Sequence, residues 1–479
     1  MIKKIFLISL FCSLSFAEEL PLARQTPPVG TSYEEMMVYL NTLIATNDRL
    51  EIEIIGKSVS GRTIPAIYFP PKSDRDEDDS TIMLFAQQHG DEPSGKEALL
   101  MLITQFADQK FPFSLNNLNL ILIPTVNPDG NELDQRRNAN DVDLNRNHVI
   151  LTEPEVQALH RVFDRYKPEV TLDIHEYGMK TWLDSGYIKD LGEQLDVVSN
   201  PAIPAEIKSF SLEKILHPVL KATRKRGARA NRYLITRSDM DHFIRHSTTD
   251  INDGRNGFGI RHTLSFILEG LNGLTKSDRI WQRSKYQLTL IEEFLRICNK
   301  HSSRIVALVR DIRSRHEKNL TDSVTIHADY TPEVSQPIEL TLKRTSDLKD
   351  TLITFSDYRP RPQIIAKVKR IPAYVVKQPD SMLVEMLNKQ GIEYREMEVS
   401  VKCMIEEFQV KGQDTLRYES RDTIIPAGFF VAKERIFEKG DIIIPTASIR
   451  ADQIVQILEP QSFYGISHYD EFKHLWHIS

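Results

Sequence analysis

Two side chains of the kind that bind zinc, His89 and Glu92, lie three residues apart in the chain. They follow the apolar segment 81–86, which has the composition of a buried strand, and they precede a helical pattern. With this spacing, at a point where a strand gives way to a helix, both side chains can face one point. A further histidine, His175, ends the strand-like segment 170–174. Because a catalytic zinc ion takes three protein ligands and leaves one position for water, the sequence predicts one zinc ion per chain, bound by these three residues.

Each piece of this pattern also has a simpler explanation. A chain with 14 histidines should contain roughly one His-x-x-Glu pair by chance, and a lone histidine is usually a surface or hydrogen-bonded core residue. For His175 the simpler explanation is a loop histidine hydrogen-bonded beside Glu176. A catalytic centre is favoured by the order of further motifs, each placed after a strand-like segment. These motifs are Asn-Pro-Asp-Gly at 127–130, Asp-Leu-Asn-Arg at 143–146, Asp-Ile-His-Glu at 173–176 and Leu-Glu-Gly at 268–270.

The ordered set resembles the zinc carboxypeptidases of the carboxypeptidase A type, firmly over residues 31–300 and loosely in the tail. The resemblance implies a mixed sheet and assigns His89, Glu92 and His175 as the zinc ligands. It also implies that Glu269, at the end of an apolar strand, is the general base that takes a proton from zinc-bound water. A buried carboxylate is costly without a partner or a task, and a strand-end salt bridge would be a simpler role for Glu269.

The segment 138–146 resembles the part of the family in which an Asn-Arg pair holds the terminal carboxylate of the substrate. The resemblance gives this role to Asn145 and Arg146, and a guanidinium suits it because it offers two parallel donors to a carboxylate. An upstream arginine in the family polarises the scissile carbonyl and stabilises the oxyanion. The family spacing selects Arg136, but the neighbouring Arg137 could point inward instead and stays a candidate for substrate binding.

One departure from the family concerns the mobile tyrosine that closes over the substrate and precedes the general base. The corresponding segment 246–254 contains no tyrosine. Either His246, or a tyrosine from elsewhere such as Tyr187 or Tyr233, or no residue at all takes that place. The amino acid that the enzyme releases is left open, because no residue of a selectivity pocket aligns securely in this region.

The alternation of strand-like and helical runs predicts an α/β domain over residues 31–305, after a lead-in at 18–30. One helix is expected after Thr152, which forms a capping box with Glu155 and is followed by Pro154 in the first turn. The expected strands are 52–55, 82–86, 118–124, 170–174 and 264–268.

After residue 306 the apolar residues alternate with a period of two, which is typical of half-buried antiparallel strands. We therefore expect a β-rich module at 306–371 and a mixed or β-rich module at 372–479, with β segments up to about residue 458. The strands expected in the first module are 324–330, 337–342 and 351–355. The fold class expected overall is α/β, a mixed-sheet zinc carboxypeptidase domain followed by smaller β-rich C-terminal modules.

The N-terminus has the pattern of a secretory signal peptide over residues 1–17. Two lysines precede an apolar stretch, and Ser15 and Ala17 supply the small residues of a cleavage site. Cys12 would suit a lipoprotein, but Phe11 before it is too large for lipoprotein processing. We therefore expect a periplasmic or secreted protein.

Composition excludes several classes of partner and fold. The formal net charge of −6 gives no reason to expect a nucleic-acid partner. Cys298 and Cys403 fall in different expected domains, so no disulfide framework is predicted. No later run reaches the apolar length of a spanning helix, so no transmembrane segment is expected in the mature chain. The oligomeric state is left open.

The sequence therefore predicts a secreted or periplasmic zinc metallocarboxypeptidase. Its order of domains resembles the bacterial murein-peptide carboxypeptidases that influence cell shape, which implies a muropeptide substrate and the conversion of murein tripeptide to dipeptide. A general peptide or protein carboxypeptidase would have the same zinc site. The pattern is also compatible with an amidohydrolase or deacylase on the same scaffold, and with a non-catalytic protein that binds peptide ends.

Overall fold

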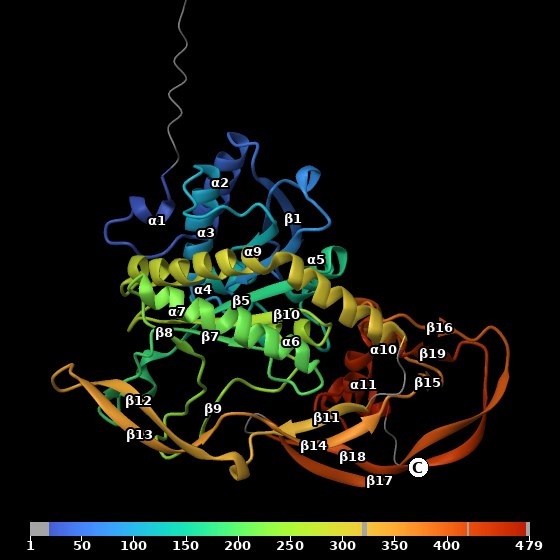
Figure 1. The fold of residues 1–479 in the computed structure, drawn as a ribbon. Coiled ribbons are helices and arrows are strands. Elements are labelled where there is room, and N and C mark those ends of the chain that lie inside the picture. The colour runs from blue at the N-terminus through green and yellow to red at the C-terminus, as the bar shows by residue number, and fades with distance from the viewer. Residues whose placement is uncertain (1–18, 319–322, 419–420, 476–479) are drawn as a thin grey trace, which may run out of the picture.

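The computed structural model describes residues 19–318, 323–418 and 421–475 (Figure 1). The expected signal peptide at 1–17 lies outside these residues. None of the helices in the described ranges is both long enough and apolar enough to cross a membrane.

A mixed sheet of eight strands forms the centre of the larger domain. Its strands, in spatial order, are β1 (Glu51–Lys57), β2 (Thr63–Phe69), β4 (Leu118–Ile123), β3 (Ser80–Ala86), β5 (Val170–Tyr177), β10 (Leu264–Leu271), β7 (Glu193–Val197) and β8 (Ala230–Arg232). The four strands β4, β3, β5 and β10 are parallel, whereas the pairs β1–β2, β2–β4 and β10–β7 are antiparallel. The expected α/β fold with a mixed sheet is confirmed, and all five strands expected in this region are present.

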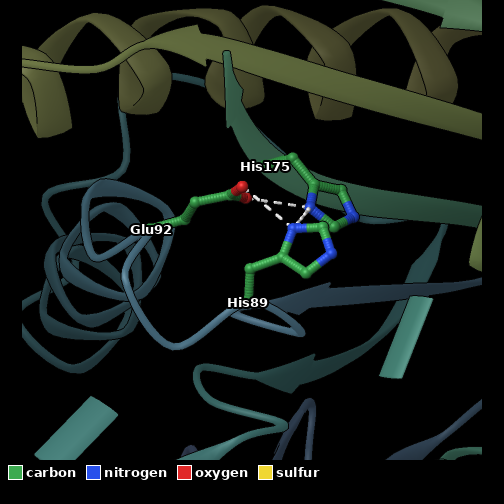
Figure 2. Close-up of side chains that lie close together, drawn as sticks. All are labelled: His89, Glu92 and His175. Atoms are coloured by element: carbon green, nitrogen blue, oxygen red, sulfur yellow. Dashed lines mark hydrogen bonds and ion pairs between the residues drawn. The ribbon is translucent and has the colours of Figure 1, made fainter. Parts of the chain in front are cut away.

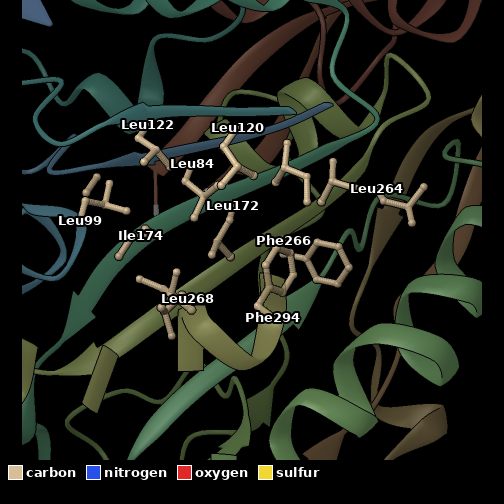
Figure 3. Packing of buried hydrophobic residues seen from close by; sticks show 14 of the residues in the cluster. Leu84, Leu99, Leu120, Leu122, Leu172, Ile174, Leu264, Phe266, Leu268 and Phe294 are labelled. Atoms are coloured by element: carbon tan, nitrogen blue, oxygen red, sulfur yellow. The ribbon is translucent and has the colours of Figure 1, made fainter. Parts of the chain in front are cut away.

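Helices cover both faces of this sheet. They are α1 (Pro21–Arg24), α2 (Tyr33–Ala45), α3 (Ser94–Ala107), α4 (Pro128–Leu133), α5 (Pro154–Tyr166), α6 (Ala205–Phe210), α7 (His217–Lys225), α8 (Gly254–Gly259) and α9 (Ile280–Lys318). On one face Leu172, Ile174 and Leu268 pack with Phe294 of α9 in the cluster drawn in Figure 3, which also includes residues of α2, α3 and α7. On the other face Phe85 packs with residues of α5 and α8. Every residue of β5 is buried, as expected for a central parallel strand.

The predicted capping box of α5 is wrong. The N-cap is Glu153 rather than Thr152, and its side chain makes no capping hydrogen bond. The Thr152 hydroxyl instead accepts a hydrogen bond from Asn147 Nδ2 at 2.7 Å. The Glu155 carboxylate accepts from Val59 N at 3.1 Å. Thr152 is therefore used in a contact with the preceding loop, and Glu155 in a tertiary contact that the local sequence does not reveal.

In its described residues, the C-terminal region contains small sheets, two α-helices and short 3₁₀ turns. Its elements are β11 (Ser323–Asp329), β12 (Gln336–Arg344), β13 (Asp350–Arg359), β14 (Gln363–Lys369), β15 (Ala373–Val376), α10 (Ser381–Lys389), β16 (Arg395–Glu396), β17 (Val401–Tyr418), β18 (Arg421–Phe437), β19 (Ile442–Pro445) and α11 (Ala451–Leu458). The three strands expected before residue 371 correspond to β11, β12 and β13. Close to residue 458, where β segments were expected, the chain forms the helix α11.

The β12–β13 hairpin forms a four-stranded sheet with two short strands from earlier in the chain, β6 (Tyr187–Ile188) and β9 (Ile244–Arg245). Helix α9 continues for 39 residues without a break across residue 305, where a domain boundary was expected. The catalytic and C-terminal parts are thus joined by a continuous helix and by a shared sheet, and the division into domains remains a prediction.

Candidate active site

The three predicted metal ligands meet beside the carboxyl ends of β3 and β5 (Figure 2). His89 Nδ1 lies 2.9 Å from Glu92 Oε1, and His175 Nδ1 lies 2.9 Å from Glu92 Oε2. The two Nδ1 atoms are 3.1 Å apart, and all three side chains are buried. Two imidazole nitrogens and a carboxylate that face one point are a ligand set that zinc prefers. His89, Glu92 and His175 therefore form a possible metal site.

A tight loop between β3 and α3 positions the first two of these residues. Gln87, directly after β3, has a φ of 58°, and the chain then turns through Gly90. A Cβ atom on Gly90 would lie 2.0 Å from the carbonyl carbon of Gly130, so only glycine allows the two loops to approach this closely. Gly130 has its own steric cause, because a Cβ atom on it would lie 2.5 Å from Asn127 Nδ2 and 2.8 Å from the carbonyl oxygens of Gln135 and Arg137.

Each histidine directs its other ring nitrogen to an aspartate. His89 Nε2 is 3.1 Å from Asp143 Oδ1, and His175 Nε2 is 2.8 Å from Asp173 Oδ1. A carboxylate behind a metal-binding imidazole fixes its orientation and raises its basicity. Sequence reasoning gives no role to either aspartate, although each is the first residue of a motif, Asp-Leu-Asn-Arg or Asp-Ile-His-Glu.

The charges in this cluster keep Glu92 ionised and favour the protonated form of His175, whose proton a bound metal ion would displace. Burial would raise the pKa of the Glu92 carboxyl, but His89 and His175 outweigh burial and lower that pKa. Burial would lower the pKa of His175, but Asp173 and Glu92 raise it well above its usual value. The ionised Glu92 between two imidazoles is therefore a centre of negative charge that favours a cation.

Glu269 stands opposite His175 in the parallel pairing of β5 and β10. Burial raises the pKa of Glu269 to about 7, with His175 opposing the shift and Glu92 adding to it. A buried carboxyl group with a pKa near neutrality is suited to accept a proton and to return it.

The structure brings Arg136, rather than Arg137, to the metal ligands. Arg136 Nη1 lies 3.1 Å from His89 Nδ1, and its Nε donates to Asp143 Oδ2 at 3.0 Å. Arg137 Nη1 instead donates to the carbonyl oxygen of Asp141 at 2.7 Å. The side chain of Arg136 is 44% exposed, which leaves the guanidinium accessible to a substrate.

Asn145 and Arg146 lie next to this centre in a short 3₁₀ turn. Asn145 Nδ2 is 3.1 Å from His175 Nε2, and Asn145 Oδ1 accepts a hydrogen bond from Gly254 N at 2.7 Å. Arg146 is half-buried, and its Nη1 donates to the carbonyl oxygen of Asn145 at 2.7 Å. Asn145 of the predicted carboxylate-binding pair therefore contacts the possible metal ligand His175, and Arg146 is hydrogen-bonded to Asn145.

Tyr233 is the tyrosine that the structure brings to Glu269, through a hydrogen bond between the two side chains. The backbone oxygen of Tyr233 contacts His246 Nδ1 at 2.7 Å, while His246 Nε2 contacts the Tyr358 hydroxyl at 2.6 Å. His246 is thus buried behind Tyr233. Tyr187 belongs to β6, where it packs against the β12–β13 hairpin.

A buried lysine near Glu269 escapes sequence reasoning. Lys189 Nζ donates to the carbonyl oxygen of Leu234 at 3.3 Å. Burial lowers the pKa of Lys189 to about 8, with the negative charge of Glu269 opposing this shift. No motif surrounds Lys189, so nothing in the local sequence could have indicated its position.

Comparison with known proteins agrees with this geometry. Residues 36–266 match the family model described as zinc carboxypeptidase. Carboxypeptidase 2 of Trichophyton rubrum is 22% identical over 446 residues, which cover 90% of this chain and 82% of that protein. Murein peptide amidase A of Escherichia coli is 31% identical over 154 residues, which cover 26% of this chain and 58% of that protein.

Among solved structures, carboxypeptidase A from Helicoverpa armigera superposes with a TM-score of 0.44 at 18% identity, covering 56% of this chain and 74% of that chain. The family match spans the strands and loops that carry His89, Glu92 and His175. Residues 36–266 are therefore those of a zinc carboxypeptidase domain, and the protein is a zinc-dependent hydrolase.

Proposed function

We propose that this enzyme removes the C-terminal residue of a peptide at the site formed by His89, Glu92, His175 and Glu269. The main support is that the possible metal ligands, a carboxyl group with a pKa of about 7 and the guanidinium of Arg136 lie at one edge of the sheet. A zinc ion bound there supplies an activated water and a Lewis acid for amide hydrolysis.

Protein side chains carry out proton transfer, stabilisation of the oxyanion and binding of the substrate terminus. Glu269 takes a proton from the attacking water and returns it to the leaving amine, because its pKa lies close to neutral pH. Arg136, held by Asp143, donates hydrogen bonds to the scissile carbonyl oxygen as negative charge develops on it. Arg146, with Asn145 beside it, binds the terminal carboxylate of the substrate.

The metal ligands can be tested by metal analysis. His175→Ala should lower the zinc content by one ion per chain relative to the native protein, because it removes one of three ligands. Mass spectrometry of the purified proteins measures this content. His217→Ala, which changes an exposed histidine of α7, is the matched control and should lose no zinc. An unchanged zinc content in His175→Ala would refute the ligand assignment.

Turnover measurements test the general base and the choice of arginine. Glu269→Gln preserves shape but removes the base, so turnover should fall at least about 10²-fold. Arg136→Ala should cost about 10² to 10³-fold through the loss of oxyanion stabilisation. Arg137→Ala is the matched control and should have a much smaller effect, since this side chain faces Asp141. If Arg137→Ala has the larger effect, the roles of the two arginines are reversed.

A third comparison tests the recognition of the substrate terminus. Arg146→Ala should raise KM for peptides with a free C-terminal carboxylate, because it removes the charge-assisted donors. Amidation of the peptide should have the same effect on the native enzyme. Equal cleavage of free and amidated peptides would point instead to an endopeptidase or a deacylase.

We further propose that the substrates are peptidoglycan stem peptides and that the enzyme is periplasmic or secreted. The signal-like pattern at 1–17 and the likeness to murein peptide amidase A support this. Arg255 adds a structural argument, because it is fully buried beside Gly254, the hydrogen-bond partner of Asn145. Its Nε and Nη1 atoms have no hydrogen-bond partner among the described residues. They suit a substrate with a second carboxylate, as in diaminopimelate.

Digestion of muropeptides tests this substrate class. The native enzyme should convert tripeptides ending in diaminopimelate to dipeptides, followed by mass spectrometry. Arg255→Met should slow this conversion while sparing peptides with a neutral C-terminal side chain, which report that the variant is folded. Intact tripeptides beside rapid trimming of ordinary L-peptides would identify a general peptide carboxypeptidase and leave the zinc site in place.

A further inference from the structure

A second group of metal-binding side chains, His262, His316 and Asp452, lies outside the catalytic centre. His262 has a φ of 60° in the turn before β10, and His316 is in the last turn of α9. Asp452 is in the first turn of α11. Figure 1 shows how α9 brings its C-terminal end to the region of α11. The group therefore joins the catalytic domain to the C-terminal region.

The three ligand atoms lie within 4.8 Å of one another, and the two distances from Asp452 match the spacing of ligands around a tetrahedral ion. His262 Nε2 is 3.2 Å from Asp452 Oδ2, and His316 Nε2 is 3.4 Å from the same oxygen. Ligands bound at about 2.1 Å in a tetrahedron lie about 3.4 Å from each other. His262 is fully buried, Asp452 is buried, and the side chain of His316 is 14% exposed, which leaves a path for a water as fourth ligand.

The surrounding contacts orient His316 and Asp452 as they do around bound metals, whereas His262 Nδ1 has no hydrogen-bond partner among the described residues. His316 Nδ1 lies 2.9 Å from the carbonyl oxygen of Ile312 and donates to it, so Nε2 carries the lone pair of the neutral ring. Arg370 Nη2 donates to the other carboxylate oxygen, Asp452 Oδ1, at 2.5 Å. A carbonyl behind an imidazole and a donor on the free oxygen of a carboxylate are the usual outer partners of metal ligands.

Two imidazole nitrogens face the same oxygen of Asp452. Either a proton or a cation must therefore lie between each nitrogen and that oxygen. A proton on each Nε2 is one solution, with His316 as an imidazolium paired with Asp452. A divalent cation is the other, and it satisfies all three atoms at once while both rings stay neutral. Arg370 pairs with Asp452 through Oδ1, whereas Oδ2 is the oxygen that faces the two imidazoles.

We propose that His262, His316 and Asp452 bind a second divalent ion of the zinc type, with a structural rather than a catalytic role. His262 precedes the N-terminal end of β10, and Glu269 lies near the other end of that strand. At about 3.3 Å per residue, the two are separated by roughly 20 Å, too far for the ion to reach the reacting bond. The ion ties α11 to the end of α9 and the turn before β10.

Metal content in a set of variants tests the second site without reference to peptidase activity. The native protein, loaded with Zn²⁺ and desalted, should hold two ions per chain. His89→Ala should retain one ion, at the second site. His316→Gln should also retain one ion, at the catalytic site, with normal turnover, and the double variant should hold none. His301→Gln, on the same helix, is the matched control and should keep both ions.

A second readout separates a metal from an ion pair. Co²⁺ loaded into the His89→Ala variant should give the visible absorption of a four-coordinate ion, and a chelator should lower its Tm, because an ion that binds only the folded chain stabilises it. The double variant should show neither effect. A His89→Ala variant that holds no ion and has a chelator-independent Tm would overturn the proposal and leave a His-Asp ion cluster. This outcome does not depend on any folding defect of the His316 variants and leaves the proposed carboxypeptidase site untouched.

Discussion

Parallel pairing places Glu269 of β10 opposite His175 of β5, and places Ala86 at the end of β3 opposite Ile174. Successive residues of a strand point to opposite faces, so a slip of one residue would turn His175 into the apolar layer under α9. Leu172 and Ile174 prevent such a slip, because they are buried in that layer. Hydrophobic packing on one face of the sheet therefore sets the positions of the polar groups on the other.

In this buried centre, the neighbouring charges determine the pKa of each acidic side chain. Glu92 lies between two imidazoles and has a lowered pKa, whereas Glu269 is buried with weaker compensation and has a pKa of about 7. Two residues of one type, both in the same centre, are thus prepared for different tasks, one to bind a cation and the other to exchange a proton. Glu176, the next residue after His175, is kept away from this chemistry by its 2.7 Å ion pair with Arg283.

The C-terminal region supports the catalytic domain through buried polar contacts as well as through the shared β6–β12–β13–β9 sheet. Arg261 Nη2 donates to Gln390 Oε1 at 2.6 Å, and Gln390 Nε2 donates to the carbonyl oxygen of Val149 at 2.6 Å. Near the active site, Tyr358 of β13 contacts His246, which in turn contacts the backbone of Tyr233. The tyrosine beside Glu269 is therefore held in part by a hairpin that lies far away in the sequence.

The sequence alone determined the α/β class, the central strands and the candidate ligands His89, Glu92 and His175, because hydrophobic periodicity and motif spacing are local properties. Tertiary structure decided which neighbouring side chain faces the centre. It turns Arg136 inward and Arg137 toward Asp141, since Asp143 and the loop around Gly130 set the path of that segment. The placement of Asp143 behind His89, the contact of Tyr233 with Glu269 and the loss of the expected capping box likewise depend on segments far apart in the chain. Such contacts result from the packing of the sheet and its loops, and no local sequence pattern predicts that packing.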